Sequence, residues 1–201
     1  MAEALAKPRV SVPDYLAFER EAEQRHELID GEIVDMSGGT FAHSVISLNL
    51  GAELRAALRE RPCTVCSPDL RVKAADLYTY ADVTVVCGSP IFDDRHRDTL
   101  LNPIALFEVL SDSTEAYDRG EKFAAYRSIA SLQEYVLVSQ KTVAVEHFHR
   151  QPDGAWLLRT LGPGEQLVLP ALGCEIAVNE VYLKAFEGEK PGSDEPFHER
   201  V

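Results

Sequence analysis

The sequence lacks several features that would assign it to common classes of protein. No uninterrupted apolar segment approaches the roughly 20 residues that a membrane-spanning helix needs, and Met1-Ala2-Glu3 opens without the basic and apolar segments of a secretory signal. There is no glycine-rich phosphate-binding loop and no Gly-x-Ser-x-Gly motif, so P-loop nucleotide hydrolysis and serine hydrolysis lose their usual support. We therefore expect a cytoplasmic protein without a membrane partner.

Cysteines and basic residues are also scarce. Four cysteines in 201 residues, without the composition of a disulfide scaffold, are typical of a reducing compartment. The pair Cys63 and Cys66 has no second pair to complete a metal site, so we expect buried thiols there. Lysine and arginine total 20 against 33 acidic residues, which gives a net charge of -13. That balance argues against tight nonspecific binding to nucleic acid, which requires a basic surface.

Length and apolar content set limits on the fold. With 45% hydrophobic residues, the chain can bury one substantial core. We expect one domain over residues 1–186 and an acidic, disordered tail over residues 187–201. The pattern of apolar residues predicts an α/β fold with a central mixed sheet flanked by helices. Four helices are expected: one over 11–24, one that ends at Pro62, one that begins at 118 and one over 180–186. Strands are expected within 63–72, 82–87 and 104–110, around 135, and within 142–160 and 174–178.

A single carboxylate interrupts the most apolar of these strands. Glu108 lies within Ile104–Leu110, a run typical of a strand buried on both faces, where an ionised carboxylate is disfavoured unless it is paired or binds a metal. Asp82 stands near the start of the apolar run that ends at Cys87. Arginine pairing of Glu108 and turn capping by Asp82 would explain them separately. A shared divalent cation would explain both, and we favour it.

Two further polar residues follow on the next predicted helix. Asp118 and Glu121 have the spacing of a capping box, which predicts a helix that begins there with Lys122 in its first turn. A lysine at that end gains nothing from the helix dipole. Tyr126 is four residues later and shares the face of Lys122, so the pair could overhang the end of the Glu108 strand. Taken alone, Lys122 also fits a solvated helix residue and Tyr126 a core aromatic with a hydrogen-bonded hydroxyl.

The order and spacing of these motifs resemble the Uma-two family, a bacterial family classed with restriction endonucleases in the PD-(D/E)XK nuclease superfamily. The resembling segments, in order, are Glu27-Leu28-Ile29-Asp30-Gly31-Glu32-Ile33-Val34, His43, Ala81-Asp82-Val83, Glu108-Val109-Leu110-Ser111, Asp118-Arg119, Lys122, Tyr126 and Glu134-Tyr135-Val136-Leu137-Val138. Ala81 replaces the proline usual in the family. Leu110 stands where the superfamily's lysine commonly lies, so the resemblance implies that Lys122 supplies that group from the following helix.

The resemblance implies a restriction-endonuclease-like fold and a divalent-metal-dependent endonuclease acting on DNA. Asp82 and Glu108 would bind Mg²⁺ or Mn²⁺, and Lys122 would orient the attacking water or stabilise charge in the transition state. Glu27 would complete the acidic cluster, although it could be an ordinary strand residue. His43 lies on the inward stripe of its helix and would face the same cleft with Tyr126, although an interior histidine fits the same pattern.

The expected partner is specific or structured DNA, because the net charge of -13 disfavours tight nonspecific binding. Nucleases that cut both strands often act as dimers, so a homodimer is expected as well. One rival is a noncatalytic interaction or regulatory module that keeps the nuclease fold, in which Asp82 and Glu108 pair with internal cations. Another is a metal-dependent hydrolase of a different phosphate ester.

One histidine pair stands outside this scheme. The sequence His147-Phe148-His149 would put both imidazoles on one face of a strand, which permits adventitious metal binding. The nearby turn Gln151-Pro152-Asp153-Gly154 instead predicts a solvated end of a hairpin, and we interpret both histidines as surface residues.

Overall fold

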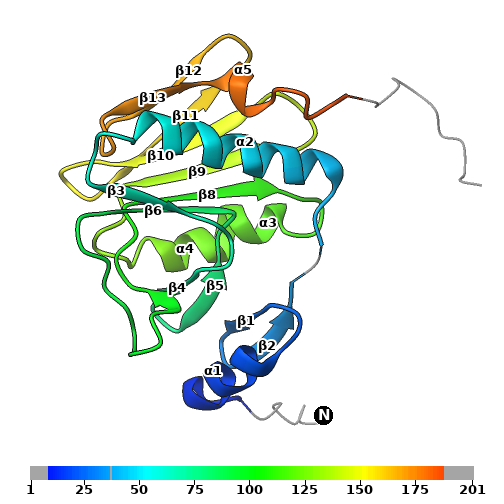
Figure 1. Ribbon diagram of the computed structural model, residues 1–201, viewed down its shortest axis with the longest axis vertical. Helices are drawn as coiled ribbons and strands as arrows, with labels where there is room; N and C mark the ends of the chain where they lie inside the picture. Colours follow the sequence, from blue (N-terminus) through cyan, green and yellow to red (C-terminus); the bar gives the residue numbers. More distant parts are fainter. Residues whose placement is uncertain (1–8, 37, 188–201) are drawn as a thin grey trace, which may run out of the picture.

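The computed structural model describes residues 9–36 and 38–187 (Figure 1). Its helical segments are α1 Val12–Glu21, α2 Phe41–Ala57, α3 Glu115–Tyr117, the π-helix η1 Asp118–Lys122, α4 Phe123–Tyr126 and α5 Val178–Val181. Its strands are β1 His26–Ile29, β2 Glu32–Asp35, β3 Cys63–Cys66, β4 Arg71–Ala74, β5 Leu77–Tyr80, β6 Val83–Cys87, β7 Thr99–Leu100, β8 Ala105–Leu110, β9 Glu134–Ser139, β10 Val145–Arg150, β11 Trp156–Leu161, β12 Gln166–Leu169 and β13 Cys174–Ala177.

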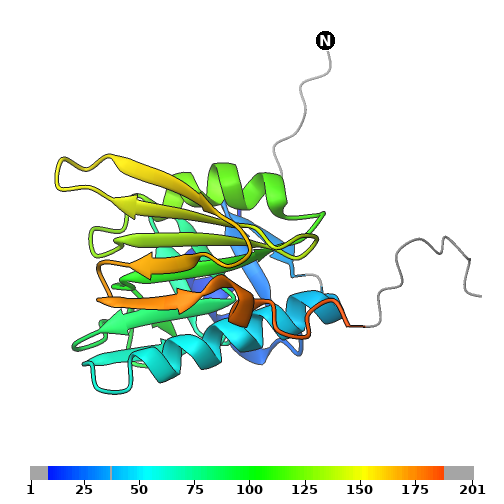
Figure 2. The ribbon, with the colours of Figure 1, turned by 90° about the horizontal axis from the view of Figure 1, so that it is seen from above.

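A six-stranded sheet with the order β11-β10-β9-β8-β6-β3 forms the centre of the fold. β8 and β9 run parallel, whereas the other neighbouring pairs in this sheet are antiparallel. Helix α2 lies on one side of the sheet and α3 to α4 lie on the other, as Figure 2 shows. The α/β fold with a central mixed sheet flanked by helices is therefore confirmed.

Both faces of β8 are covered, which explains why its sequence is almost entirely apolar. All six of its residues are buried. Phe107 and Val109 face the cluster that contains the apolar stripe of α2, together with β12, β13 and α5. Leu106 and Leu110 face the opposite cluster, which contains Tyr126. Glu108 lies between Leu106 and Leu110 on this second face, because side chains alternate along a strand.

A second sheet, with the order β2-β1-β5-β4-β7, contains a hairpin whose turn is formed by Asp30 and Gly31. Both residues have positive φ, 49° and 78°, the conformation that an Asp-Gly pair favours in a two-residue hairpin. The sequence pattern missed β5 and β7. The connection after β6 is not exposed throughout, because Thr99 is buried and β7 pairs in parallel with β4.

The helical segment near Lys122 begins earlier than predicted. α3 begins at Glu115, and the hydroxyl of Ser111 accepts a hydrogen bond from the backbone N–H of Thr114 just before it. Asp118 therefore lies inside the helical segment and does not cap it. The prediction that Lys122 occupies the first turn is wrong, because the Ser111 turn starts the segment and Lys122 ends its π-helical part. π-Helical turns are rare and are frequent at functional sites.

The cysteines also differ from expectation. Cys63 and Cys87 are directly opposite each other in the antiparallel pair of β3 and β6, and they form a disulfide. Cys66 and Cys174 are free and half-buried. The prediction of a thiol is therefore wrong for Cys63, whose partner is 24 residues away and is set by strand register, whereas Cys66 keeps a free thiol.

Two expectations from the sequence concern the rest of the chain. The proposed acidic tail over 187–201 lies outside the described residues, apart from Glu187. Within the described ranges, none of the helices has the length and apolar character that crossing a membrane requires.

Asp98 connects α1 to the segment before β7. Its carboxylate lies 2.8 Å from Arg20 Nε and 3.0 Å from an amino group of Arg71, which is 3% exposed. Burial alone would raise the pKa of Asp98, but the two arginines outweigh it and lower the pKa to about 2. The ionised form of Asp98 therefore stabilises the folded state.

We expect Asp98→Asn to lower the free energy of unfolding by about 1–2 kcal/mol near neutral pH. The pKa of Asp98 in the folded protein lies below its value of about 3.9 in the unfolded chain. The stabilisation is therefore fully present when the pH is above about 3.9 and is lost as the pH falls toward about 2. Urea denaturation of both proteins should show the difference shrinking over that range. Asp69→Asn, which removes an exposed partner of Arg25, should change stability less, and a difference independent of pH would contradict the assignment.

Candidate active site

Lys122 lies at the centre of a buried cluster of carboxylates. Its Nζ is 3.0 Å from Glu108 Oε1, 3.5 Å from Glu27 Oε1 and 3.6 Å from Asp118 Oδ1. It also donates a hydrogen bond of 3.2 Å to the backbone carbonyl of Tyr80. Lys122 is 5% exposed and Glu108 is 4% exposed. One ammonium group is therefore shared among three carboxylates in the interior of the protein.

Glu108 is held through one oxygen of its carboxylate. The hydroxyl of Tyr126 donates to Oε1 at 2.9 Å, and Lys122 contacts the same oxygen. The two side chains therefore approach Glu108 from one face of the helical segment, as their spacing of four residues predicted. Within the part of the chain that the structure describes, Oε2 of Glu108 has no hydrogen-bond partner, and Glu108 lines a cavity.

Asp82 is brought beside Glu108 by strand register. It directly precedes β6, in which Val83 is the partner of Phe107 in β8. Asp82 Oδ2 accepts a hydrogen bond of 2.7 Å from the backbone N–H of Val109, and His43 Nε2 lies 3.4 Å from the same oxygen. Asp82, just before β6, therefore lies next to Glu108 in β8, and the side chain of Asp82 remains 17% exposed.

These residues surround one cavity of about 430 Å³. The lining includes the candidates Glu27, His43, Asp82, Glu108 and Lys122. The remaining candidate, Tyr126, is fully buried behind Glu108 and reaches the site only through its hydroxyl. Residues 38–39 and the turn that begins at Ser111 form further parts of the wall. A cavity of this size can admit part of a ligand to the charged cluster.

Burial and charge shift the proton affinities of the cluster. Burial raises the pKa of Glu108 well above its ordinary value, although Lys122 opposes the rise. Burial alone would lower the pKa of Lys122, but the carboxylates of Glu108, Glu27 and Asp118 outweigh it and hold that pKa well above its usual range. The hydrogen bond from His43 to Asp82 raises the pKa of His43. Lys122 therefore stays charged, and His43 gains proton affinity.

Asp118 and Tyr117 were missed as site residues. Asp118 was assigned to a helix cap, yet it is 3% exposed and burial raises its pKa. Its spacing of four residues from Lys122 was the available signal. Tyr117 also lines the cavity, and its buried hydroxyl makes no hydrogen bond to any described residue. Buried hydroxyl groups normally have a hydrogen-bond partner. A ligand group that enters the cavity could supply that partner for Tyr117.

Glu27 does not form a compact group of metal ligands with Asp82 and Glu108. In the described residues, the one trio of candidate metal-ligating side chains whose donor atoms all lie within 4.8 Å of one another is found elsewhere, on β9 and β10. Glu27 instead accepts a hydrogen bond from the hydroxyl of Thr79 and contacts Lys122. Its position fits a residue that holds Lys122 in place.

The chain has a nuclease-like α/β fold, and the sequence comparisons identify its family. A family model described as "Uma2: Putative restriction endonuclease" matches residues 12–179. The chain belongs to the Uma2 family. The resemblance inferred from the motif order is thereby confirmed.

Two relatives and one solved structure are similar to most of the chain. The chain is 36% identical over 177 residues to the uncharacterized protein slr1290 of Synechocystis sp., covering 87% of this chain and 92% of that protein. It is 34% identical over 154 residues to the uncharacterized protein sll1609 of the same organism, covering 76% and 87%. A crystal structure from Anabaena variabilis, described as a putative nuclease belonging to DUF820, matches with a TM-score of 0.73 at 16% identity, covering 88% of this chain and 99% of that one. The structural match shows a shared fold.

Proposed function

We propose that this protein is a divalent-metal-dependent endonuclease that hydrolyses phosphodiester bonds in DNA. The observation that carries the proposal is the position of Lys122, 3.0 Å from Glu108 in the cavity that Asp82 also lines. Two carboxylates and a lysine on one cavity are the groups that the PD-(D/E)XK resemblance requires. Membership of the Uma2 family, described as "Putative restriction endonuclease", supports the same reaction class.

Asp82 and Glu108 are suited to hold Mg²⁺ or Mn²⁺, because these hard cations prefer carboxylate oxygens. Each carboxylate is anchored through one oxygen, Asp82 Oδ2 by Val109 and Glu108 Oε1 by Lys122 and Tyr126. The second oxygen of each makes no hydrogen bond within the described ranges and is therefore the donor that a cation would use. When bound, the metal would neutralise charge on the phosphate and lower the pKa of a bound water.

The remaining residues have roles that follow from their contacts. Lys122 is positively charged and lies in a largely dry site, so its ammonium can orient the attacking water or stabilise charge that builds on the phosphate. Glu27 and Tyr126 would act as positioning residues, for Lys122 and Glu108 respectively. His43 holds a proton more strongly because of Asp82, and from the rim it can donate a hydrogen bond to an anionic substrate.

The charge of the chain narrows the expected substrate. A net charge of -13 gives little general attraction to a phosphate backbone, so we propose recognition of specific or structured DNA. We also propose a homodimer, because two copies of the chain could each cut one strand of a DNA duplex. A cytoplasmic location would give access to such DNA, whereas the disulfide between Cys63 and Cys87 is more typical of an oxidising compartment.

The proposal is tested by incubating supercoiled, linear, single-stranded and branched DNA with Mg²⁺ or Mn²⁺. We expect cleavage that requires metal and falls by about 10²–10³-fold or more in Asp82→Asn. Asp35→Asn is the matched control, because Asp35 is an exposed carboxylate on the same cavity and should leave cleavage nearly unchanged. Failure of the folded wild-type protein to cut any of these substrates with either metal would refute the proposal, and so would full cleavage by Asp82→Asn.

A noncatalytic module that keeps the nuclease fold is the second candidate. The buried contact between Lys122 and Glu108 favours it, because an internal cation already balances the strand carboxylate. The exposed part of Asp82 and the open cavity favour the enzyme, since a purely structural pair requires neither. A module would bind nucleic acid or protein without metal-dependent cleavage, which the same assay distinguishes.

A further inference from the structure

A second polar cluster lies on the face of the central sheet opposite to Glu108. Glu134 begins β9, and His147 and His149 alternate along β10, where His149 is the direct partner of Glu134. The segment between β12 and β13 covers them, and the backbone N–H of Ala171 donates to Glu134 Oε1 at 2.8 Å. We expected both histidines at the surface, but His147 is only 4% exposed. That prediction is wrong for His147, because the β12–β13 hairpin packs over this strand, whereas His149 remains partly exposed.

The three side chains converge on one point. His147 Nε2 lies 2.6 Å and His149 Nδ1 lies 2.9 Å from the same oxygen, Glu134 Oε2. One donor atom from each residue falls within 4.8 Å of the others. Glu134 is fully buried, and its other oxygen is fixed by Ala171. The arrangement therefore offers two imidazole nitrogens and one oriented carboxylate oxygen on the same side of a buried site.

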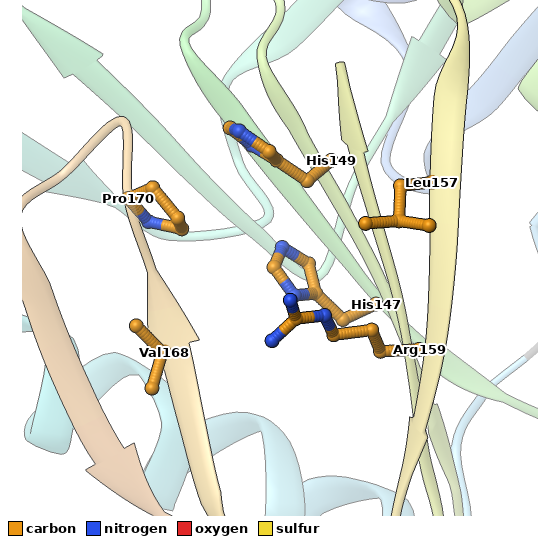
Figure 3. Close-up of a pocket in the computed structure, with 6 residues that line it drawn as sticks. All are labelled: His147, His149, Leu157, Arg159, Val168 and Pro170. Carbon is orange, nitrogen blue, oxygen red and sulfur yellow. The ribbon is translucent and has the colours of Figure 1, made fainter. Parts of the chain in front are cut away.

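A small cavity of about 60 Å³ adjoins two of the three residues, His147 and His149. Figure 3 shows the rings of His147 and His149 and the side chain of Arg159 beside this space, with Val168 and Pro170 on its opposite wall. A cavity of this size has room for a cation and one or two water molecules. The exposed Arg159 at the edge would favour an anion or a hydroxide in the remaining position.

Simple hydrogen bonding explains this cluster less well. Glu134 Oε2 can accept hydrogen bonds from both histidines, but such bonds make no use of the cavity that His147 and His149 line. A cation bound by the three donors uses the same convergence, satisfies the fully buried charge of Glu134 and fills the cavity. Fixing the carboxylate through Ala171 is also typical of the outer hydrogen bonds that orient metal ligands.

We propose that Glu134, His147 and His149 form a Zn²⁺-binding site, separate from the site of Asp82 and Glu108. Two imidazoles and one carboxylate match the preferences of Zn²⁺, whereas Mg²⁺ prefers oxygen ligands alone. Three protein ligands leave one position open toward the cavity. The site does not depend on the nuclease proposal, because it lies on the other face of the sheet.

The test measures Zn²⁺ affinity of the full-length protein, stripped of metal, by competition with a chromophoric chelator. We expect one Zn²⁺ site whose affinity falls about 10-fold or more in His149→Ala, because losses of even outer-shell partners cost that much. His149 is partly exposed, so this change should be tolerated in folding. His96→Ala removes an exposed histidine elsewhere and Asp82→Asn alters the other site, and both should retain the affinity.

Two further measurements keep the test decisive. Glu134→Gln preserves the shape of the buried side chain and should also lose the Zn²⁺ site, and Co²⁺ should give visible absorption bands in wild type that are absent from both variants. Equal Zn²⁺ affinity in wild type, His149→Ala and Glu134→Gln would overturn the proposal. Loss of the Zn²⁺ site in Asp82→Asn with retention in His149→Ala would overturn it too, because the metal would then belong to the other cavity.

Discussion

Replacing Lys122 with methionine should lower the free energy of unfolding by about 3–5 kcal/mol, measured by urea denaturation in the presence of EDTA. The physical reason is that Lys122 is the common partner of Glu108, Glu27 and Asp118, and all four side chains are buried. Methionine preserves most of the aliphatic volume, so the loss is mainly electrostatic. Removing one partner of a buried ion pair leaves an uncompensated charge, which costs more than an unfavourable surface contact.

A double-mutant cycle isolates this effect. Glu108→Gln keeps an acceptor for the hydroxyl of Tyr126 but removes the charge nearest to Lys122. The free energy of unfolding of Glu108→Gln/Lys122→Met should therefore exceed the value expected from adding the two single changes by about 1–3 kcal/mol. Lys141→Met is the matched control, because Lys141 pairs with an exposed carboxylate and should show no measurable change. Strict additivity would mean that Lys122 and Glu108 are not energetically coupled.

Several elements of the fold could be predicted because their signals are local. The run that contains Phe107 has the length and composition of a doubly buried strand, and the Asp30-Gly31 pair defines its own hairpin. The apolar stripe of α2 repeats with helical spacing. By contrast, β7 and the disulfide between Cys63 and Cys87 depend on pairing between distant segments, and no local pattern specifies such a register.

The site was predictable in part. A charge inside an apolar run pointed to Glu108, and a spacing of four residues placed Lys122 and Tyr126 on a common face, which the structure brings to the same carboxylate oxygen. The location of Asp118 was misjudged because its capping pattern is local, whereas the real start of the helix is set by Ser111. Burial of a histidine by a distant hairpin also leaves no trace in neighbouring residues, so the cluster around His147 could not be recognised.

The double variant Glu108→Gln/Lys122→Met should separate folding from catalysis. If the proposed nuclease reaction occurs in this cavity, the variant should cleave DNA at least about 10³-fold more slowly than wild type with Mg²⁺ or Mn²⁺, because it lacks both a metal ligand and the cation that stabilises developing charge. The rate is measured on whichever DNA the wild-type protein cuts, at protein concentrations where urea denaturation shows the variant to be folded.

The comparison with stability makes this result informative. Lys122→Met alone could lose activity simply by unfolding, whereas the double variant retains a neutral, hydrogen-bonded side chain at position 108 and recovers part of the stability. Lys141→Met should cut at the wild-type rate. A folded double variant that still cuts within about tenfold of wild type would move the reaction out of this cavity. A double variant that is folded but inactive would mean that the charges of Glu108 and Lys122 are retained for the reaction and not for stability. Either buried charge destabilises the fold when its partner is removed.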